Sequence, residues 1–345
     1  AQRGTSFADV GDGVYTLDRF ETSKSTDGAI TVTQETLSSG NAYNAGFRTA
    51  LKCDVTTADG TLATNQRFFI QQIIEAQNLQ VLKFGTSSAE KLTLSFWVKA
   101  TKTGTHVVRM YAYDDDRSVS ISYTVSSSDT WEHKVLNFPA DTTGVIDNDN
   151  GQGIQIAWAM GAGASFQSGT LATTWGSNTT ANDFVGQVNG LDSTSNNFHL
   201  TGVQLEVGEF SSTTLPPFQF ESFGDNLARC QRYYQEIANE SKNGGNDTSI
   251  GITNSYNNSS MDCIIQLKQS MRSKPSLNQN TGSNMFRWYG NGSDANMTSL
   301  AVGADSNNTE SVNLQQGSSI TTAQGSSGNL QTRDSTAFVA ADAEL

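Results

Sequence analysis

A repeated alternation of apolar and polar residues runs through the middle of this chain, and it constrains the fold more than any other feature. Residues 92–99 carry apolar side chains at alternate positions, with one extra aromatic residue, and turn-rich sequences separate them from similar segments. A period of two gives a β-strand one buried face and one solvated face. Short strands joined by such turns are typical of a β-sandwich or a jelly roll. The predicted strands of this series are residues 92–99, 106–113, 118–125, 131–138, 153–160 and 198–207.

The composition agrees with short strands rather than long helices. Only 16% of the 345 residues are charged, and much of the polarity comes from Ser, Thr, Asn and Gln, alongside 31 glycines. These residues favour turns and caps over helix interiors. The net charge of −13 argues against nucleic acids and anionic membranes as partners, because both repel an acidic surface. No apolar run approaches the roughly 18 residues that a membrane-spanning helix needs, so no membrane insertion is predicted.

A change in composition divides the chain into domains. Residues 211–218 hold two of the four prolines and end the first domain. We predict an N-terminal segment over residues 1–14, a jelly roll over 15–210, a linker with a short helix over 211–240, and a C-terminal β domain over 241–345. The fold class is therefore all-β, with a jelly-roll β-sandwich followed by a short helix and a second, small β-sandwich. Strands of the last domain are predicted at residues 249–253, 261–267, 285–289, 299–302, 311–314 and 337–341.

One apolar segment, residues 67–84, fits two structures. Its spacing would suit an amphipathic helix, whereas a strand over residues 67–74 followed by a turn suits its surroundings better. A Thr- and Gly-rich stretch precedes it, and the neighbouring segments all have strand patterns. We favour the strand.

The strongest helical pattern lies in residues 225–238, just after the proline-containing linker. Asp225 is placed to cap the N-terminus of this helix. A helix this short needs a neighbour to dock on. The residues predicted to share its apolar face are Leu227, Cys230, Tyr234 and Ile237.

The sequence offers no clear catalytic constellation, so we predict that the chain is not an enzyme. Its three histidines, His106, His133 and His199, lie inside alternating strands without the pattern of a nucleophile and its base. The densest carboxylate cluster is Asp114 to Asp116. A glycosidase needs two carboxyl groups across a sugar ring, but we interpret this cluster as a solvated turn.

Calcium is the one cofactor that remains open. Residues 147–151 (DNDNG) resemble the start of an EF-hand loop, but the distal glutamate and the flanking helices are missing. A structural Ca²⁺ elsewhere in the sandwich stays an alternative, without assigned ligands. The cysteines Cys53, Cys230 and Cys263 form no CxxC pair, and we interpret them as buried apolar side chains.

Aromatic residues are the candidates for sugar binding, because aromatic faces pack against the C–H faces of sugar rings. Trp97, Trp131 and Trp158 lie in predicted strands, and we interpret them as core residues. Trp175 differs because its loop, residues 173–178, is rich in Thr, Gly, Ser and Asn. It is either a lid over the core or an exposed contact. The candidate glycan-binding residues are Trp175, Tyr111, Tyr113 and Asp114.

Three stretches of the chain resemble phage tail-fibre and virion-appendage proteins. Residues 2–7 (QRGTSF) with residues 15–20 (YTLDRF) are similar to the family opening WQRGTSF…YTADRW, with Ala1 at the tryptophan position. The most specific match joins LTGVQLEVG, PF and CQRYY, which resemble ITGVQLEVG…TPFE…LARCQRYY. The third match is to the family ending MRaaPtl…AFDAEL. The second match lies at residues 200–208, 217–218 and 230–234, and the third lies at residues 271–275 and 338–345.

The resemblance implies a first domain shaped like a carbohydrate-binding jelly roll, a non-catalytic structural role and often a homotrimer. It also implies an upstream segment for attachment to the virion, and we expect this segment to be missing from the chain. In related carbohydrate-binding modules a paired Asp-Asp near the last strand helps to hold calcium. Thr201 and Gly202 stand at that place here, which weakens the calcium alternative.

These expectations combine into one leading hypothesis with two rivals. The chain is expected to be the distal part of a phage tail fibre or similar appendage, assembled in the bacterial cytoplasm and carried on the virion. Its partners would be two further copies of itself, other virion proteins and a host surface polysaccharide, with multivalency raising the affinity. One rival is a capsid-decorating or head-fibre protein without a ligand. The other is a glycan-depolymerising tailspike, a class that usually shows a long β-helical repeat.

Overall fold

The computed structural model describes residues 1–245, 247–290, 293–303 and 308–345, and it shows an all-β protein. Two compact units make up the chain, with Arg3–Phe220 forming the bulk of the first and Glu221–Glu344 the bulk of the second. Every strand pair in both units is antiparallel. No helix within the described ranges has the length and apolar character that crossing a membrane requires.

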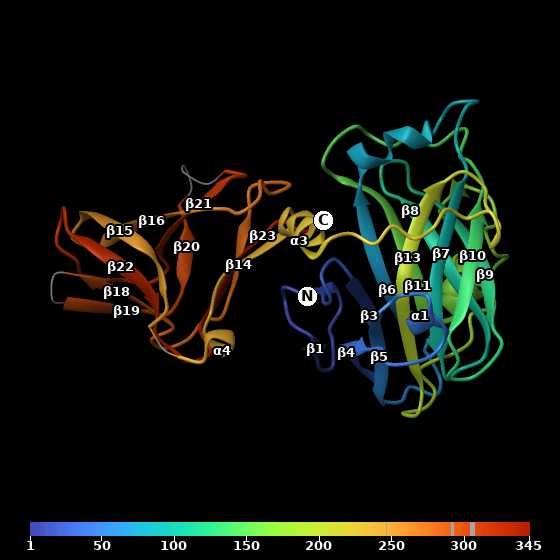
Figure 1. Ribbon diagram of the computed structural model, residues 1–345, viewed down its shortest axis with the longest axis horizontal. Coiled ribbons are helices and arrows are strands. Elements are labelled where there is room, and N and C mark those ends of the chain that lie inside the picture. Colours follow the sequence, from blue (N-terminus) through green and yellow to red (C-terminus); the bar gives the residue numbers. More distant parts are fainter. Residues whose placement is uncertain (246, 291–292, 304–307) are drawn as a thin grey trace. The chain divides into compact units, whose positions relative to one another are not determined.

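The first unit is a β-sandwich of a six-stranded and a seven-stranded sheet (Figure 1). Strands that are distant in sequence lie next to each other in both sheets, as in a jelly roll. In order, the six-stranded sheet contains β1 (Ser6–Phe7), β4 (Ala29–Thr36), β5 (Thr49–Thr57), β13 (Asn197–Val207), β7 (Leu92–Ala100) and β10 (Glu132–Phe138). The seven-stranded sheet contains β12 (Gly176–Ser177), β9 (Arg117–Val125), β8 (Gly104–Ala112), β11 (Gln152–Ala162), β6 (Arg67–Glu75), β3 (Glu21–Ser25) and β2 (Val14–Tyr15).

Alternate residues of the facing strands fill the core between these sheets. Phe96 of β7 and Trp158 of β11 are fully buried, and their ring centroids lie 5.9 Å apart. Burial of each such side chain stabilises the fold by roughly 1.5–3 kcal/mol. The prediction that Trp158 is a core residue is confirmed. Residues 67–75 form strand β6, followed by a 3₁₀ turn over Ala76–Leu82, so the strand interpretation of this segment is confirmed as well.

Strand β13 does not keep the regular alternation that its sequence predicts. Strict alternation places Leu200 on the polar face and Val203 and Leu205 on the other, but all three pack against the same core. The register of β13 against β7 shifts between Thr201 and Gln204, which is a β-bulge. The extra residue reverses the direction of the side chains that follow it. The predicted face of Leu200, which precedes the bulge, is therefore wrong.

Gly202 makes this bulge feasible. Its φ is +59°, and a Cβ atom at this position would lie 2.5 Å from the Phe47 ring. We expect Gly202→Ala to lower the free energy of unfolding of the first unit by about 1–3 kcal/mol, because both strain and overlap would follow. Chemical denaturation checks this. Gly60→Ala is the control, since nothing lies within 4 Å of a Cβ built there; equal effects of the two substitutions would contradict the assignment.

The second unit is a smaller β-sandwich with a three-stranded and a seven-stranded sheet. The three-stranded sheet has the order β14 (Tyr234–Asn239), β23 (Phe338–Asp342) and β17 (Ser276–Gln279). The seven-stranded sheet has the order β19 (Ser293–Met297), β18 (Phe286–Gly290), β22 (Ser327–Thr332), β15 (Ser249–Asn257), β16 (Ser260–Gln266), β21 (Ser311–Gln316) and β20 (Leu300–Val302). One apolar core contains residues of both sheets, among them Val339, Trp288 and Leu314.

Helix α3 of the second unit covers Phe223–Gln231 and is shorter than predicted, and a second, short helix, α4, covers Glu240–Asn243. Ser222, rather than Asp225, caps it: the Asp225 N–H donates to Ser222 Oγ, and the Ser222 hydroxyl donates to the Asp225 carboxylate. Residues 234–238, which the sequence predicts as the end of the helix, belong instead to β14, and β14 pairs with β23. Pairing with a distant strand outweighs local helical propensity here.

Candidate functional site

Two of the sequence-predicted residues, Tyr111 and Tyr113, lie together on the outer face of the seven-stranded sheet. Tyr111 belongs to β8 and Tyr113 follows its end, and their ring centroids are 4.9 Å apart at 86°. Both side chains are half-buried. Burial and the adjacent Asp116 carboxylate raise the pKa of Tyr111 to about 12, and burial raises the pKa of Tyr113. Both hydroxyls are therefore protonated at neutral pH.

Polar neighbours on adjacent strands hold these rings in place. Gln155 of β11 is the cross-strand partner of Tyr111, and its amide donates a 2.9 Å hydrogen bond to the Tyr113 hydroxyl. The Tyr111 hydroxyl donates to Asp116 at 2.8 Å. The Arg109 guanidinium lies 5.3 Å from the centre of the Tyr111 ring and also donates to Gln155.

A buried ion pair anchors Arg109. Its guanidinium donates a 2.7 Å hydrogen bond to the fully buried carboxylate of Asp183. Burial raises the pKa of Asp183, and the adjacent Arg109 opposes this shift. The pair holds the guanidinium beneath Tyr111, so the ring and the cation have one fixed arrangement.

The same face continues across two further strands. Gln71 of β6 lies opposite Glu21 of β3, and its amide donates a 2.7 Å hydrogen bond to the Glu21 carboxylate. Burial is the main cause that raises the pKa of Glu21. We call this surface the tyrosine face. It consists of Glu21, Gln71, Arg109, Tyr111, Tyr113 and Gln155.

The structure places the other two predicted site residues elsewhere. Trp175 is buried in the sandwich core, where its indole N–H donates to the Pro139 carbonyl at 2.9 Å and its ring packs on Phe84. Of the two alternatives for Trp175, the structure shows the lid over the core and not the exposed contact. Asp114 is exposed, and its carboxylate accepts the backbone N–H of Asp147.

Sequence reasoning missed Glu21, Gln71, Gln155 and Arg109. Gln71 and Gln155 are amides at outward positions of strongly apolar strands, and this is a usable signal once a strand has been assigned. Which strands are neighbours is not visible in the sequence. No signal therefore showed that these residues meet the tyrosines.

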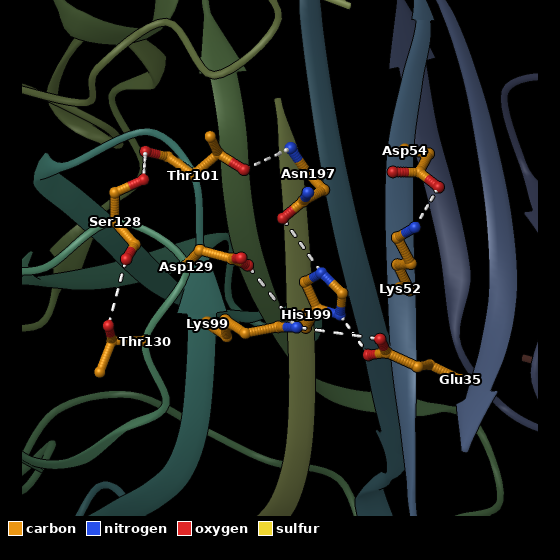
Figure 2. Close-up of polar contacts among 10 residues, drawn as sticks. All are labelled: Glu35, Lys52, Asp54, Lys99, Thr101, Ser128, Asp129, Thr130, Asn197 and His199. Carbon is orange, nitrogen blue, oxygen red and sulfur yellow. Dashed lines mark hydrogen bonds and ion pairs between the residues drawn. The ribbon is translucent and has the colours of Figure 1, made fainter. Parts of the chain in front are cut away.

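The outer face of the six-stranded sheet carries a second polar cluster, centred on His199 of β13 (Figure 2). Lys52 of β5 and Lys99 of β7 lie opposite His199 on its two sides. Burial, with the two ammonium groups, lowers the pKa of His199 to about 3. The neutral ring donates from Nδ1 to Glu35 at 2.6 Å, and its Nε2 lies 3.0 Å from the Asn197 amide.

Charges in this second cluster largely satisfy one another. The Lys99 ammonium nitrogen lies 3.8 Å from a carboxylate oxygen of Glu35 and 3.6 Å from one of Asp129. The Lys52 ammonium nitrogen lies 2.5 Å from a carboxylate oxygen of Asp54 (Figure 2).

Two tryptophans predicted to be core residues lie on this outer face. Trp131 is buried there in a separate apolar cluster that includes Leu37 and Phe47, and Lys99 lies over its ring. Trp97 is half-buried and stacks on the exposed His133 ring at 5.0 Å. The interpretation of Trp131 as a core residue is confirmed, because its side chain is buried in an apolar cluster, although this cluster is not the one between the two sheets. The interpretation of Trp97 as a core residue is wrong, because its side chain is only half-buried on the outer face.

No group of three or more His, Cys, Asp or Glu side chains is arranged to hold a metal ion within the described ranges. The structural calcium has no ligand set to which it can be assigned. It stays an open prediction.

No protein-family model matches the chain, and no curated protein matches it. Among solved structures, the chain is similar to the enzymatically active domain of tailspike protein 4 of bacteriophage CBA120, with 15% identity and a TM-score of 0.32 over 58% of this chain and 21% of that one. It is similar to a CBM4 structure, with 12% identity and a TM-score of 0.30 over 58% of this chain and 94% of that one. A family 11 carbohydrate-binding module from Clostridium thermocellum, in complex with a β-1,3-1,4-mixed-linked tetrasaccharide, has 12% identity and a TM-score of 0.28 over 59% and 96%.

Proposed function

We propose that the first unit binds a polysaccharide of the bacterial surface through the tyrosine face, without hydrolysing it. The observation that carries this proposal is the set of two tyrosine rings held beside a carboxylate, a guanidinium and two amides on one outer sheet surface. Sugar rings pack their C–H faces on aromatic rings, and their hydroxyls pair with carboxylate, guanidinium and phenol groups. The buried amides of Gln71 and Gln155 position Glu21 and Tyr113 for these contacts.

Within this proposal the chain is the distal part of a phage tail fibre or appendage that works as a homotrimer. One shallow sugar contact is weak. Three copies on one fibre raise the effective affinity through local concentration. The sequence motifs that resemble virion appendages support this assignment.

The proposal of binding without hydrolysis has a geometric basis. Glycosidases use two carboxyl groups that flank the scissile bond, roughly 5–10 Å apart. Glu21 is the one carboxylate among the six residues of the tyrosine face. The nearby Asp183 is buried in its pair with Arg109, and the Asp116 carboxylate beside the face accepts a hydrogen bond from the Tyr111 hydroxyl. A capsid-decorating role without a ligand is the alternative, and it predicts no glycan binding.

Binding to an array of bacterial capsular and O-antigen polysaccharides tests the proposal. We expect the native protein to bind at least one glycan, and the double variant Tyr111→Ala/Tyr113→Ala to bind it at least roughly tenfold more weakly, because the stacking surface is lost. Tyr43→Ala is the matched control, since this half-buried tyrosine lies in helix α1 (Asn41–Asn44), away from the tyrosine face. Unchanged binding by a folded double variant would contradict the proposal. Release of reducing ends from the bound glycan would show a hydrolase instead.

A further inference from the structure

Two strand edges in the second unit face each other across a pocket. β17 is the last strand of the three-stranded sheet, and β20 is the last strand of the seven-stranded sheet. The pocket has a volume of about 450 Å³, and residues 274–277 and 300–303 line it. Its volume is in the range of small ligand sites. Leu277, Leu300 and Val302 give its wall an apolar character.

The hydrogen-bond register shows which backbone groups point into the gap. The Asn280 N–H donates to the Phe338 carbonyl, so in an antiparallel pair the backbone groups of Leu277 point away from β23. The Gly303 N–H donates to the Asn313 carbonyl, so the backbone groups of Val302 point away from β21. The N–H and C=O groups of Leu277 and Val302 are therefore both directed toward the space between the two edges.

At one end of the gap, the Gln279 side chain makes the hydrogen bonds that a neighbouring strand would make. The Gln279 amide donates to the Leu300 carbonyl at 2.7 Å and accepts the Leu300 N–H at 2.8 Å. This is the pair of bonds that one residue of a neighbouring strand makes. Leu277 and Val302 lie two positions further along each strand, at the pocket. Beyond the reach of the Gln279 side chain, the backbone groups at the edge of β20 are therefore placed to form hydrogen bonds with the main chain of another segment.

We propose that this slot between β17 and β20 binds an extended peptide segment of a partner protein, which adds as a strand. Rows of main-chain N–H and C=O groups at a sheet edge pair best with another extended main chain. The apolar lining favours small apolar side chains at alternate positions. The exposed Lys274 at the pocket favours an acidic residue at one end of the segment.

The probe is a fluorescent synthetic peptide with the sequence FVAADAEL, which corresponds to residues 338–345. Its first five residues form β23, which pairs with the other edge of β17, and the sequence carries small apolar residues and two acidic ones. Fluorescence anisotropy with the full chain measures its binding. We expect saturable binding, and a peptide with lysine in place of both acidic residues is expected to bind several-fold more weakly, because it would repel Lys274.

Val302→Pro tests the main-chain contact. Proline removes the N–H that points into the slot, while the bonds of β20 to β21 come from the residues on either side of Val302. We expect a loss of affinity of about tenfold or more, whereas Val302→Ala, which keeps the N–H, should lose clearly less. Leu277→Pro tests the opposite edge in the same way and replaces Val302→Pro if that variant does not fold.

Three results would overturn the proposal. One is the absence of saturable peptide binding at a concentration of about 1 mM, which corresponds to a very weak complex. Another is equal binding by the native protein and by a folded Val302→Pro or Leu277→Pro variant. The third is a native oligomer that these variants dissociate in light scattering, since a second copy of this chain would then fill the slot. Glycan binding by the first unit is expected to remain unchanged in all variants.

Discussion

A chain that stops at Ala337, and therefore lacks β23, is expected to lose the cooperative fold of the second unit while the first unit keeps its own. β23 is the middle strand of the three-stranded sheet, paired with β14 on one side and β17 on the other. Val339, Ala340 and Ala341 are fully buried in it. Each lost backbone hydrogen bond costs about 1 kcal/mol, and a domain is stable by only about 5–15 kcal/mol. The stabilising free energy that is lost with the strand is therefore expected to exceed the free energy of unfolding of this unit.

Differential scanning calorimetry of the full and shortened chains measures this effect. We expect the unfolding transition of the second unit to disappear and that of the first unit to stay within a few degrees. A chain that lacks only Leu345 is the control, because it retains β23 and the Glu344 carbonyl that accepts a hydrogen bond from Arg272. A second transition that survives the loss of residues 338–345 would show that β23 does not hold the two neighbouring strands.

Arg109→Met is expected to destabilise the first unit by about 3–5 kcal/mol, because it leaves the carboxylate of Asp183 buried without its cation. Chemical denaturation gives the free energy of unfolding. The double variant Arg109→Met/Asp183→Asn should recover much of the loss, since no buried charge then remains. Lys83→Met is the matched control: its pair with Glu90 is exposed, and such pairs contribute about 0–1 kcal/mol.

The pH dependence of Arg109→Met gives an independent check. Burial raises the pKa of Asp183 in the folded protein, and loss of Arg109 removes the main influence that lowers it. Below the unfolded pKa the carboxyl is protonated in both states and the variant is most stable. As the pH rises through the higher folded pKa, the folded state binds more protons than the unfolded state, so the stability falls. We expect the deficit of the variant to shrink as the pH is lowered from 7 to 4. A deficit that does not change with pH would place its origin in lost packing.

The sequence predicts the fold class because alternation is a local signal. Strands β7, β8, β9, β10, β11 and β13 lie within two residues of their predicted bounds. The end of α3 was not predictable in this way. Residues 234–237 continue an apolar helical pattern, but they gain more from pairing with β23, about a hundred residues further along the chain.

The candidate site was only partly predictable. Tyr111 and Tyr113 are aromatic residues beside a predicted turn, and the structure puts them on one face. Trp175 was a candidate because its loop is polar, yet the loop folds its side chain into the core. Polarity of the surrounding sequence does not report the direction in which a single large side chain points.

By itself the sequence determined that this is an all-β chain of sandwich domains, since the period of two and the turn residues act over a few positions. Only the tertiary structure decided which outward residues meet. Glu21 and Gln71 are 50 residues apart and become partners through the register of β3 and β6. The bulge at Gly202 and the slot between β17 and β20 likewise depend on pairing between distant strands. Such pairing is set by the packing of the whole sandwich, which no local pattern contains.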